Sequence, residues 1–179
     1  MHVRAERAED QAAVYALHDA AFGAGGPVPR LVDALRLAPA ALAPTSLVAE
    51  QDGEVVGHVL LSAVRLDAPP RLVDVLSLAP LGVLPRAQGQ GIGTRLVAEA
   101  IAAAEGIGVP LLFVEGSPTY YGRRGFGPAE ELGMRRPSLR IPRAAFQVVP
   151  LPGYEPWMTG TLVYPDLFWA LDCVGLRDG

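Results

Sequence analysis

A glycine-rich turn lies between an apolar run and a helix-forming segment, and its residues are Gln88-Gly89-Gln90-Gly91-Ile92-Gly93. Residues 73–83 before it read as a buried strand. Residues 94–104 after it place apolar side chains at helical spacing. A turn of this kind leaves backbone N–H groups free at the positive end of a helix dipole, where an anion is stabilised. The sequence therefore predicts a strand–turn–helix unit that holds a phosphate or pyrophosphate.

Two widespread phosphate-binding patterns do not fit this turn. A P-loop needs a different spacing and a Lys, and the dinucleotide fingerprint GxGxxG differs at its third glycine. The pattern Q/R-x-x-G-x-G/A is filled by Gln88, Gly91 and Gly93, and the two glycines let the backbone approach a ligand closely. This pattern resembles the acetyl-CoA pyrophosphate loop of the GNAT superfamily of N-acetyltransferases. The alternative is an ordinary glycine-rich connection.

A second motif supports the resemblance. Residues 109–115 read as another buried strand, and a short helical segment follows with the pair Tyr120-Tyr121, three residues, and then Gly125-Phe126. This order is similar to a GNAT signature, and the resemblance extends over residues 3–165. It implies one N-acetyltransferase domain over residues 1–179. The implied fold is α/β, with a mixed, mostly antiparallel sheet, a splayed central strand pair and helices on both faces.

The C-terminal third resembles a bacterial GNAT subgroup with an F…L-P-G…G-x-x-x-Y-P…F pattern, whose substrates are poorly defined. The matching residues here are Phe146, Leu151, Pro152, Gly153, Gly160, Tyr164, Pro165 and Phe168.

Local patterns predict the remaining elements. Turn residues Asp52-Gly53 indicate a two-residue hairpin, and Pro80 and Gly82 inside a strand-like run indicate a β-bulge. The other expected elements are a strand at 3–4, helices over 8–22 and 29–37, and strands over 46–50, 54–61, 146–149 and 160–164.

Composition excludes several classes of protein. The net charge of −4 argues against nonspecific nucleic-acid binding, and no apolar run reaches the ~18 residues of a membrane span. One cysteine, Cys173, gives neither a disulfide nor a metal cluster, and no signal peptide is visible, so we expect a cytoplasmic protein. One basic cluster either meets an anionic ligand or forms a solvated face; it consists of Arg123, Arg124, Arg135, Arg136, Arg140 and Arg143.

The resemblance also implies the residues of a site. Acetyl-CoA is the expected cosubstrate, and Tyr121 matches the family's general acid, which protonates the departing thiolate; the alternative is that Tyr121 only packs beside the cofactor. Tyr120 is expected in the core. A backbone N–H of the bulge is expected to polarise the thioester carbonyl. The expected cofactor-binding residues are Leu81, Gly82, Val83, Gln88, Gly89, Gln90, Gly91, Ile92, Gly93 and Thr94.

The general base is not apparent, because residues 76–79 lack the carboxylate that many family members carry there. Asp74, Glu115, His58 and an ordered water are the alternatives, and His58 is equally compatible with a structural role. The expected function is acetyl transfer to a primary amine of a small molecule or protein by direct attack in a ternary complex. The alternative is a non-catalytic acyl-CoA-binding module. Tyr154, Trp157 and Trp169 either line the acceptor pocket or pack in the core, and a homodimer is left open.

Overall fold

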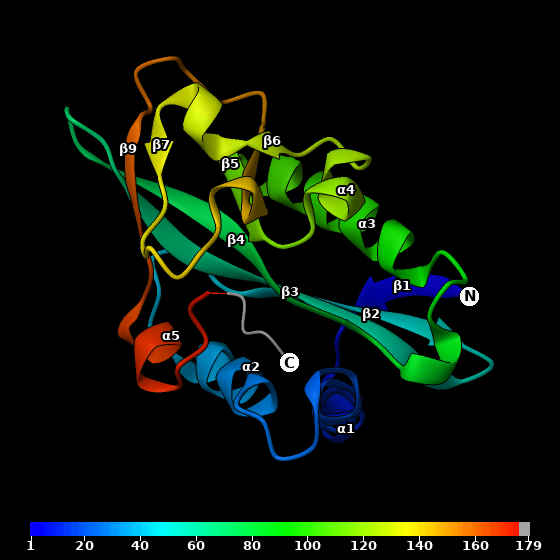
Figure 1. The fold of residues 1–179 in the computed structure, drawn as a ribbon. Coiled ribbons are helices and arrows are strands. Elements are labelled where there is room, and N and C mark those ends of the chain that lie inside the picture. The colour runs from blue at the N-terminus through cyan, green and yellow to red at the C-terminus, as the bar shows by residue number, and fades with distance from the viewer. Residues whose placement is uncertain (176–179) are drawn as a thin grey trace.

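The computed structural model describes residues 1–175, which form one mixed sheet with helices on both faces (Figure 1). The main path through the sheet is β1-β2-β3-β4-β5-β8-β6, and β9 pairs with both β3 and β7. Parallel pairing occurs between β4 and β5 and between β7 and β9, and the other described pairs are antiparallel. The strands are β1 His2–Ala5, β2 Thr45–Gln51, β3 Glu54–Asp67, β4 Leu72–Val83, β5 Leu111–Glu115, β6 Gly127–Pro128, β7 Met134–Arg135, β8 Phe146–Pro150 and β9 Gly160–Val163.

The longer helices cover opposite faces of this sheet. Helices α1 (Gln11–Phe22), α2 (Val28–Leu37) and α5 (Asp166–Ala170) lie on one face, and α3 (Ile92–Ile107) and α4 (Pro118–Gly122) lie on the other (Figure 1). The expected fold class is therefore confirmed. No helix among the described residues is long and apolar enough to span a membrane. Short 3-10 turns occupy Ala8–Asp10, Pro85–Ala87, Ala129–Leu132 and Arg143–Ala145.

Local sequence patterns predicted most ends of the helices and strands correctly. Asp52 and Gly53 both have positive φ, 51° and 81°, as a tight hairpin turn requires, and α3 begins at the residue after Gly91. The strand expected to end at Leu61 continues to Asp67. In this extension buried Val64 and Leu66 alternate with exposed Arg65 and Asp67, so the side-chain period of a strand persists.

Strand β4 carries a bulge in the middle of the sheet. Against β3, Leu61 pairs with Leu78 and Val59 pairs with Leu81, so Ala79 and Pro80 together oppose the single residue between them. The bulge lies two to three residues before Gly82 and includes Pro80, one of the two residues that indicated it. It follows the point where β4 and β5 separate, since these strands pair only at Leu76–Leu112 and Ser77–Phe113. The expected splayed central pair is therefore β4 and β5.

A buried polar network fastens α1 to the sheet. The His18 Nε2 atom lies 2.7 Å from His58 Nδ1, and His58 Nε2 lies 2.7 Å from the Ser46 hydroxyl. The Ser46 hydroxyl donates to Glu6, which also accepts hydrogen bonds from Arg36 of α2. Both imidazole rings are fully buried. Burial alone would raise the pKa of Glu6, but the nearby His58 and the hydrogen bonds from Ser46 and Arg36 lower it to about 2, so Glu6 is ionised.

The charge of Glu6 fixes the direction of every hydrogen bond in this network. A carboxylate only accepts, so Ser46 donates to Glu6 and must accept from the N–H of His58. The other ring nitrogen of His58 then accepts from His18. His18 keeps a bare Nδ1 without a hydrogen-bond partner, and this edge of the ring packs against Gly82 of β4. A side chain at position 82 would displace α1.

We predict that acidification from pH 7.5 to pH 5 destabilises the protein. Burial lowers the pKa of His18 to about 3 and also lowers the pKa of His58. Between pH 6.5 and pH 3 the unfolded chain therefore binds protons that the folded chain does not bind. His18 should cost about 2 kcal/mol of unfolding free energy between pH 7.5 and pH 5, and His58 acts in the same direction. Glu115, whose pKa burial raises, acts in the opposite direction.

Urea denaturation at several pH values measures this effect. The exposed His2 provides the control, and the His2→Gln variant should show the same decline as the wild type. Constant stability from pH 7.5 to pH 5 would contradict the neutral, buried histidine pair.

Candidate functional site

A pocket of about 500 Å³ lies where β4 ends and α3 begins. It brings together the end of β4, the glycine-rich turn, the first turn of α3 and the helix α4 region. Eight of the expected cofactor-binding residues line it, together with three further residues. The lining residues are Leu81, Val83, Gln88, Gly89, Gly91, Ile92, Gly93 and Thr94 from the expected set, and Ala87, Tyr120 and Arg124 in addition.

The glycines of the turn serve two different physical needs. Gly91 has a φ of 82°, in the left-handed region, and forms the N-cap of α3 without any side-chain cap. The first N–H groups of α3 therefore remain available to an anion in the pocket. Gly93 has ordinary helical geometry, but a Cβ there would collide with the Tyr120 hydroxyl. The turn is shaped by both backbone conformation and close packing.

The other expected residues of the turn have structural contacts. The Gln88 side-chain amide donates to the Val83 carbonyl at 3.1 Å, which ties the turn to the end of β4. Gln90 donates to the Arg86 carbonyl at 3.3 Å and does not line the pocket. Gly82 also lies outside the pocket, since its Cα faces His18 on the other side of the sheet.

Of the two tyrosines of α4, Tyr120 lies differently from the expectation. Tyr120, expected in the core, packs partly against it, but its hydroxyl reaches the turn at Gly93 and the residue lines the pocket. Tyr121 is 9% exposed and packs edge-on against Tyr120 and Phe126. Its ring also covers Gly116, where no Cβ would fit. Burial raises the pKa of Tyr121, and the neighbouring Tyr120 adds to this, so the phenol is protonated at neutral pH.

Arg124 is the residue of the basic cluster that reaches the pocket. Its guanidinium lies over the Tyr120 ring, 3.5 Å from the centroid, and donates to the Thr94 hydroxyl and the Tyr120 carbonyl. These contacts fix a positive charge beside the first turn of α3. The other arginines spread over different surfaces: Arg136 and Arg143 pair with Glu130, and Arg140 pairs with Asp172. Sequence reasoning treated the six arginines as one cluster and so missed Arg124 as a separate pocket residue.

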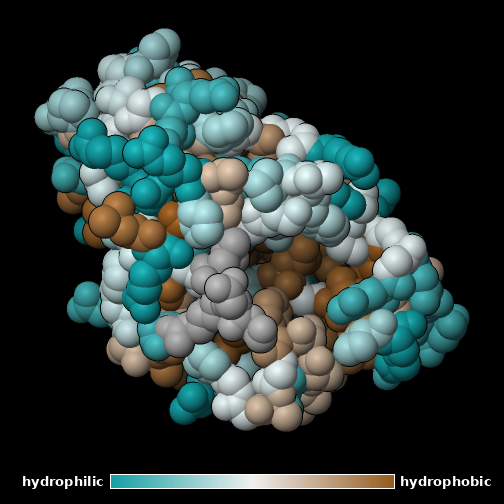
Figure 2. Space-filling view, viewed as in Figure 1, coloured by the Kyte–Doolittle hydropathy of each residue, from teal (hydrophilic) through white to brown (hydrophobic). Residues whose placement is uncertain are grey.

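The side of the sheet that carries α1 and α2 has its own opening. Figure 2 shows a hollow with apolar walls above α1, over the middle of the sheet. At the bulge, Ala79, Pro80 and Leu81 are partly exposed although β4 is a central strand. The splay therefore makes the middle of β4 accessible.

The alternatives for the general base lie in three different places. His58 is fully buried in the polar network under α1 and does not face the opening. Asp74 is exposed and pairs with Arg65 at 3.3 Å, at the far end of β4. Glu115 lies at the end of β5, partly buried, and accepts hydrogen bonds from the Tyr164 hydroxyl and from Gly175 N–H. Burial raises its pKa, and these two hydrogen bonds offset part of that increase.

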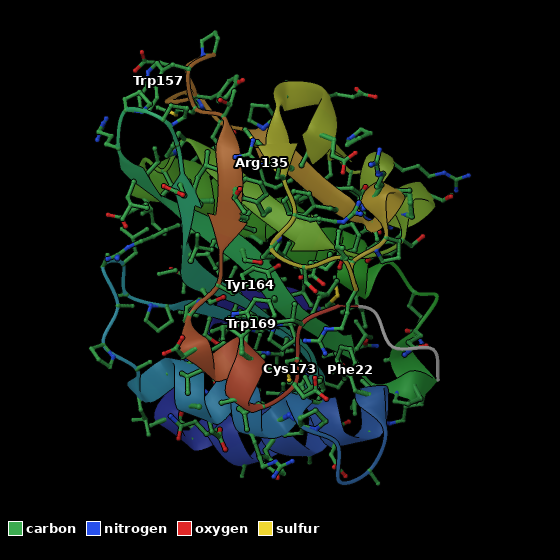
Figure 3. The ribbon with its side chains drawn as sticks, turned by 60° about the vertical axis from the view of Figure 1, so that its left-hand side comes forward. Phe22, Arg135, Trp157, Tyr164, Trp169 and Cys173 are labelled. Atoms are coloured by element: carbon green, nitrogen blue, oxygen red, sulfur yellow. The ribbon has the colours of Figure 1, made fainter. Side chains whose placement is uncertain are left out.

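The aromatic residues of the C-terminal third do not gather at one site. Trp157 lies at the top of the molecule in Figure 3, apart from Tyr164 and Trp169, which lie near its middle. Arg71 lies over the Trp157 ring, 5.2 Å from the centroid, and Tyr154 packs against the core. Trp169 is 40% exposed.

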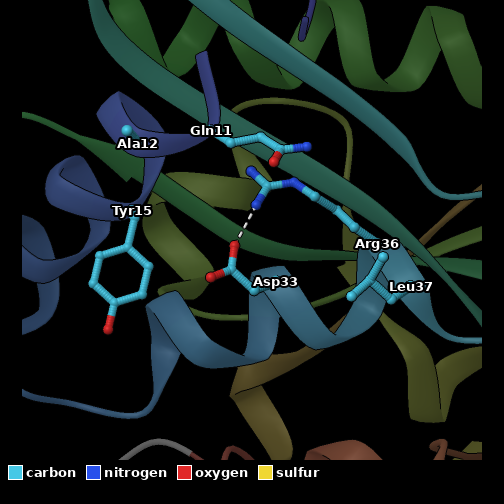
Figure 4. A pocket seen from close by; sticks show the side chains of 6 residues that line it. All are labelled: Gln11, Ala12, Tyr15, Asp33, Arg36 and Leu37. Atoms are coloured by element: carbon cyan, nitrogen blue, oxygen red, sulfur yellow. Dashed lines mark hydrogen bonds and ion pairs between the residues drawn. The ribbon is translucent and has the colours of Figure 1, made fainter. Parts of the chain in front are cut away.

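A further pocket of about 420 Å³ lies on the outer side of α1 and α2 (Figure 4). Arg36 and Asp33 form an ion pair in its wall, and Arg36 also anchors Glu6 of the buried network. Its walls come from the two helices and include none of the residues of the glycine-rich turn.

Comparisons with known proteins agree with this geometry. YhbS of Escherichia coli, solved in complex with CoA, superposes with a TM-score of 0.82 at 29% identity, covering 93% of this chain and 91% of that one. An acetyltransferase of the GNAT family from Brucella melitensis, solved with acetyl-CoA, has a TM-score of 0.74 at 33% identity over 93% of this chain and 97% of that one.

A curated relative, the uncharacterized N-acetyltransferase YjhQ of Escherichia coli K12, is 35% identical over 83 residues, which is 46% of each chain. The chain thus matches about half the length of that curated relative. The model of the acetyltransferase (GNAT) family matches residues 12–126, from α1 to the end of the Gly-Phe motif. The chain therefore belongs to the acetyltransferase (GNAT) family and is an acyltransferase.

Proposed function

We propose that the protein transfers an acetyl group from acetyl-CoA to a primary amine, on a small molecule or a protein, by direct attack in a ternary complex. The observation that carries this proposal is the opening between β4 and β5, which lies next to the pocket of the glycine-rich turn. An extended thiol cofactor seated on the turn would reach the opening along Val83 and Leu81. An amine that enters from the α1 face would meet the thioester there.

The pocket has the chemistry to hold the pyrophosphate of CoA. Uncapped N–H groups at the start of α3 and the positive charge of Arg124 converge on it, and both stabilise a phosphate. Gln88 holds the turn against the end of β4. Similar chains are solved with CoA and with acetyl-CoA, which supports the same cosubstrate for this protein.

The reaction needs two further groups at the opening. A backbone N–H of β4 after the bulge, at Leu81 or Val83, would polarise the thioester carbonyl as negative charge develops on its oxygen. Tyr121 would then donate its phenolic proton to the sulfur as the C–S bond breaks. The raised pKa of Tyr121 keeps this proton in place until a thiolate forms.

Purified protein tests the proposal directly. Mass spectrometry of the native protein should find CoA or acetyl-CoA bound, and a screen of primary amines should give amine-dependent thiol release from acetyl-CoA. Binding of acetyl-CoA without thiol release for any amine in the panel would contradict amine acetylation.

Gly91→Val should weaken acetyl-CoA binding by about tenfold or more, a loss above ~1.4 kcal/mol. A side chain at this N-cap would strain the left-handed backbone and stand between the ligand and the N–H groups of α3. Gly108→Val is the matched control, because Gly108 caps the other end of α3 with a φ of 85° and an equally open surrounding. Calorimetry should find weakened binding only in Gly91→Val, and equal affinities in the two variants would place the phosphate elsewhere.

Tyr121→Phe should lower kcat by about 10²–10⁴, the usual contribution of a general acid, with acetyl-CoA affinity within a few-fold of wild type. The substitution keeps the ring over Gly116 and removes only the proton. Steady-state kinetics with an accepted amine measure both quantities. A kcat loss in Tyr120→Phe and none in Tyr121→Phe would assign the acid role to the neighbour, and an equal loss of affinity and rate would make Tyr121 a packing residue.

A further inference from the structure

Glu115 lies across the opening from the bulge of β4. Strands β4 and β5 are parallel and last pair at Ser77–Phe113, so two residues further along each strand Glu115 comes level with Ala79. The side chains of Phe113 and Ala79 pack in the core on the α2 and α5 side of the sheet, and strand alternation places Glu115 on that same side. This is the side from which the amine would enter.

Tyr121 approaches the same end of β5 from the opposite face. Its ring packs in the core beneath α3 and covers Gly116, the residue directly after Glu115. A carboxylate and a phenol thus flank one opening from its two sides. Direct attack can use this arrangement, because the amine adds to one face of the planar thioester carbonyl and the sulfur is displaced away from the amine as the carbon becomes tetrahedral.

The surroundings of Glu115 prepare it to accept a proton. Its two oxygens accept from the Tyr164 hydroxyl and from Gly175 N–H, at 3.1 Å in the second case, and a carboxylate has further lone pairs for another donor. The hydrogen bonds from Tyr164 and Gly175 favour the ionised form of Glu115, and the positive charge of Arg140 does the same. Burial opposes both and raises the pKa of Glu115. The side chain stays partly exposed.

We propose that Glu115 is the general base of the transfer, binding the acceptor as an ammonium ion and taking a proton from its nitrogen. The lone pair that is freed forms the N–C bond with the acetyl carbon. The C–S bond breaks, the thiolate receives a proton from Tyr121, and the second proton that the nitrogen loses returns to the Tyr121 phenolate through water. The proton on Glu115 passes to water. This assignment rests on the proposed amine acetylation and supplies the base that β4 lacks.

Glu115→Gln tests the assignment, because glutamine keeps the shape and can still accept from Tyr164 but cannot take the proton. With an accepted alkyl amine at neutral pH, kcat should fall about 10²-fold or more, with KM for acetyl-CoA within a few-fold. A fluorinated analogue of the same amine, which is already deprotonated at neutral pH, should lose far less. Glu105→Gln, an exposed carboxylate on α3, is the matched control and should behave as wild type.

Tyr164→Phe provides an independent readout in the same assay. Loss of the phenolic hydrogen bond should raise the pKa of Glu115 and move the acidic limb of the pH–rate profile to higher pH, with the rate above that limb retained. Thermal unfolding of each variant checks the fold. Equal losses for both amines in Glu115→Gln, or an unmoved limb in Tyr164→Phe, would reduce Glu115 to an anchor of the C-terminal segment.

Hydrolysis of acetyl-CoA without amine tests the general-base role of Glu115 separately from the proposal that the acceptor is an amine. Water attacking the thioester would also lose its proton to Glu115, so thiol release should depend on this residue in the same way. Glu115-dependent hydrolysis together with a negative amine screen would contradict the amine acceptor and keep the base assignment. Hydrolysis unchanged in Glu115→Gln would overturn the base assignment whatever the acceptor.

Discussion

The separation of β4 from β5 is the constraint on which the site depends. A central strand normally pairs on both sides, because an unpaired backbone group inside a protein costs free energy. Here β4 keeps its pairing with β3 as far as Val83, and β5 keeps its pairing with β8 as far as Glu115, but the two strands pair with each other at only two positions. The bulge at Ala79 and Pro80 bends β4 away after the last of these. A hydrogen-bonding ligand is the natural partner of the groups that this leaves unpaired.

Where β4 and β5 no longer pair with each other, buried polar contacts support each of these two strands. On one side, His18 packs against Gly82 and is held by the hydrogen bonds that run through His58 and Ser46. On the other side, Glu115 holds the Tyr164 hydroxyl and the backbone of the C-terminal segment. Polar contacts of this kind lose much of their strength when one member is missing, because the remaining groups stay buried and unpaired. Substitutions of His18, His58, Ser46 or Tyr164 should therefore alter the opening, although these side chains have no proposed contact with a ligand.

Features set by neighbours in sequence could be predicted, and features set by distant contacts could not. The glycine-rich turn, the Asp52-Gly53 hairpin and the start of α3 depend on local conformation, and the structure agrees with all three. The extension of β3 to Asp67 was not predicted, although Val64 and Leu66 alternate with Arg65 and Asp67 as strand residues do. Strands β6 and β7, of two residues each, carry too little pattern to be recognised in a sequence.

The candidate site also contains residues that are close in sequence and could be predicted, and residues that only the fold brings together. Eight of the ten expected cofactor residues line one pocket because they lie within 14 residues of each other, at the end of β4 and around one turn. Tyr120 and Arg124 join them through packing of α4 against the first turn of α3, a contact between segments about 30 residues apart that no spacing encodes. His58 is the clearest case. Its strand position was compatible with the opening, but its partners come from three other segments, at Glu6, His18 and Ser46. Only the placement of these partners in the fold shows that His58 supports α1. With His58 in that role, Glu115 is the carboxylate that we place beside the bulge.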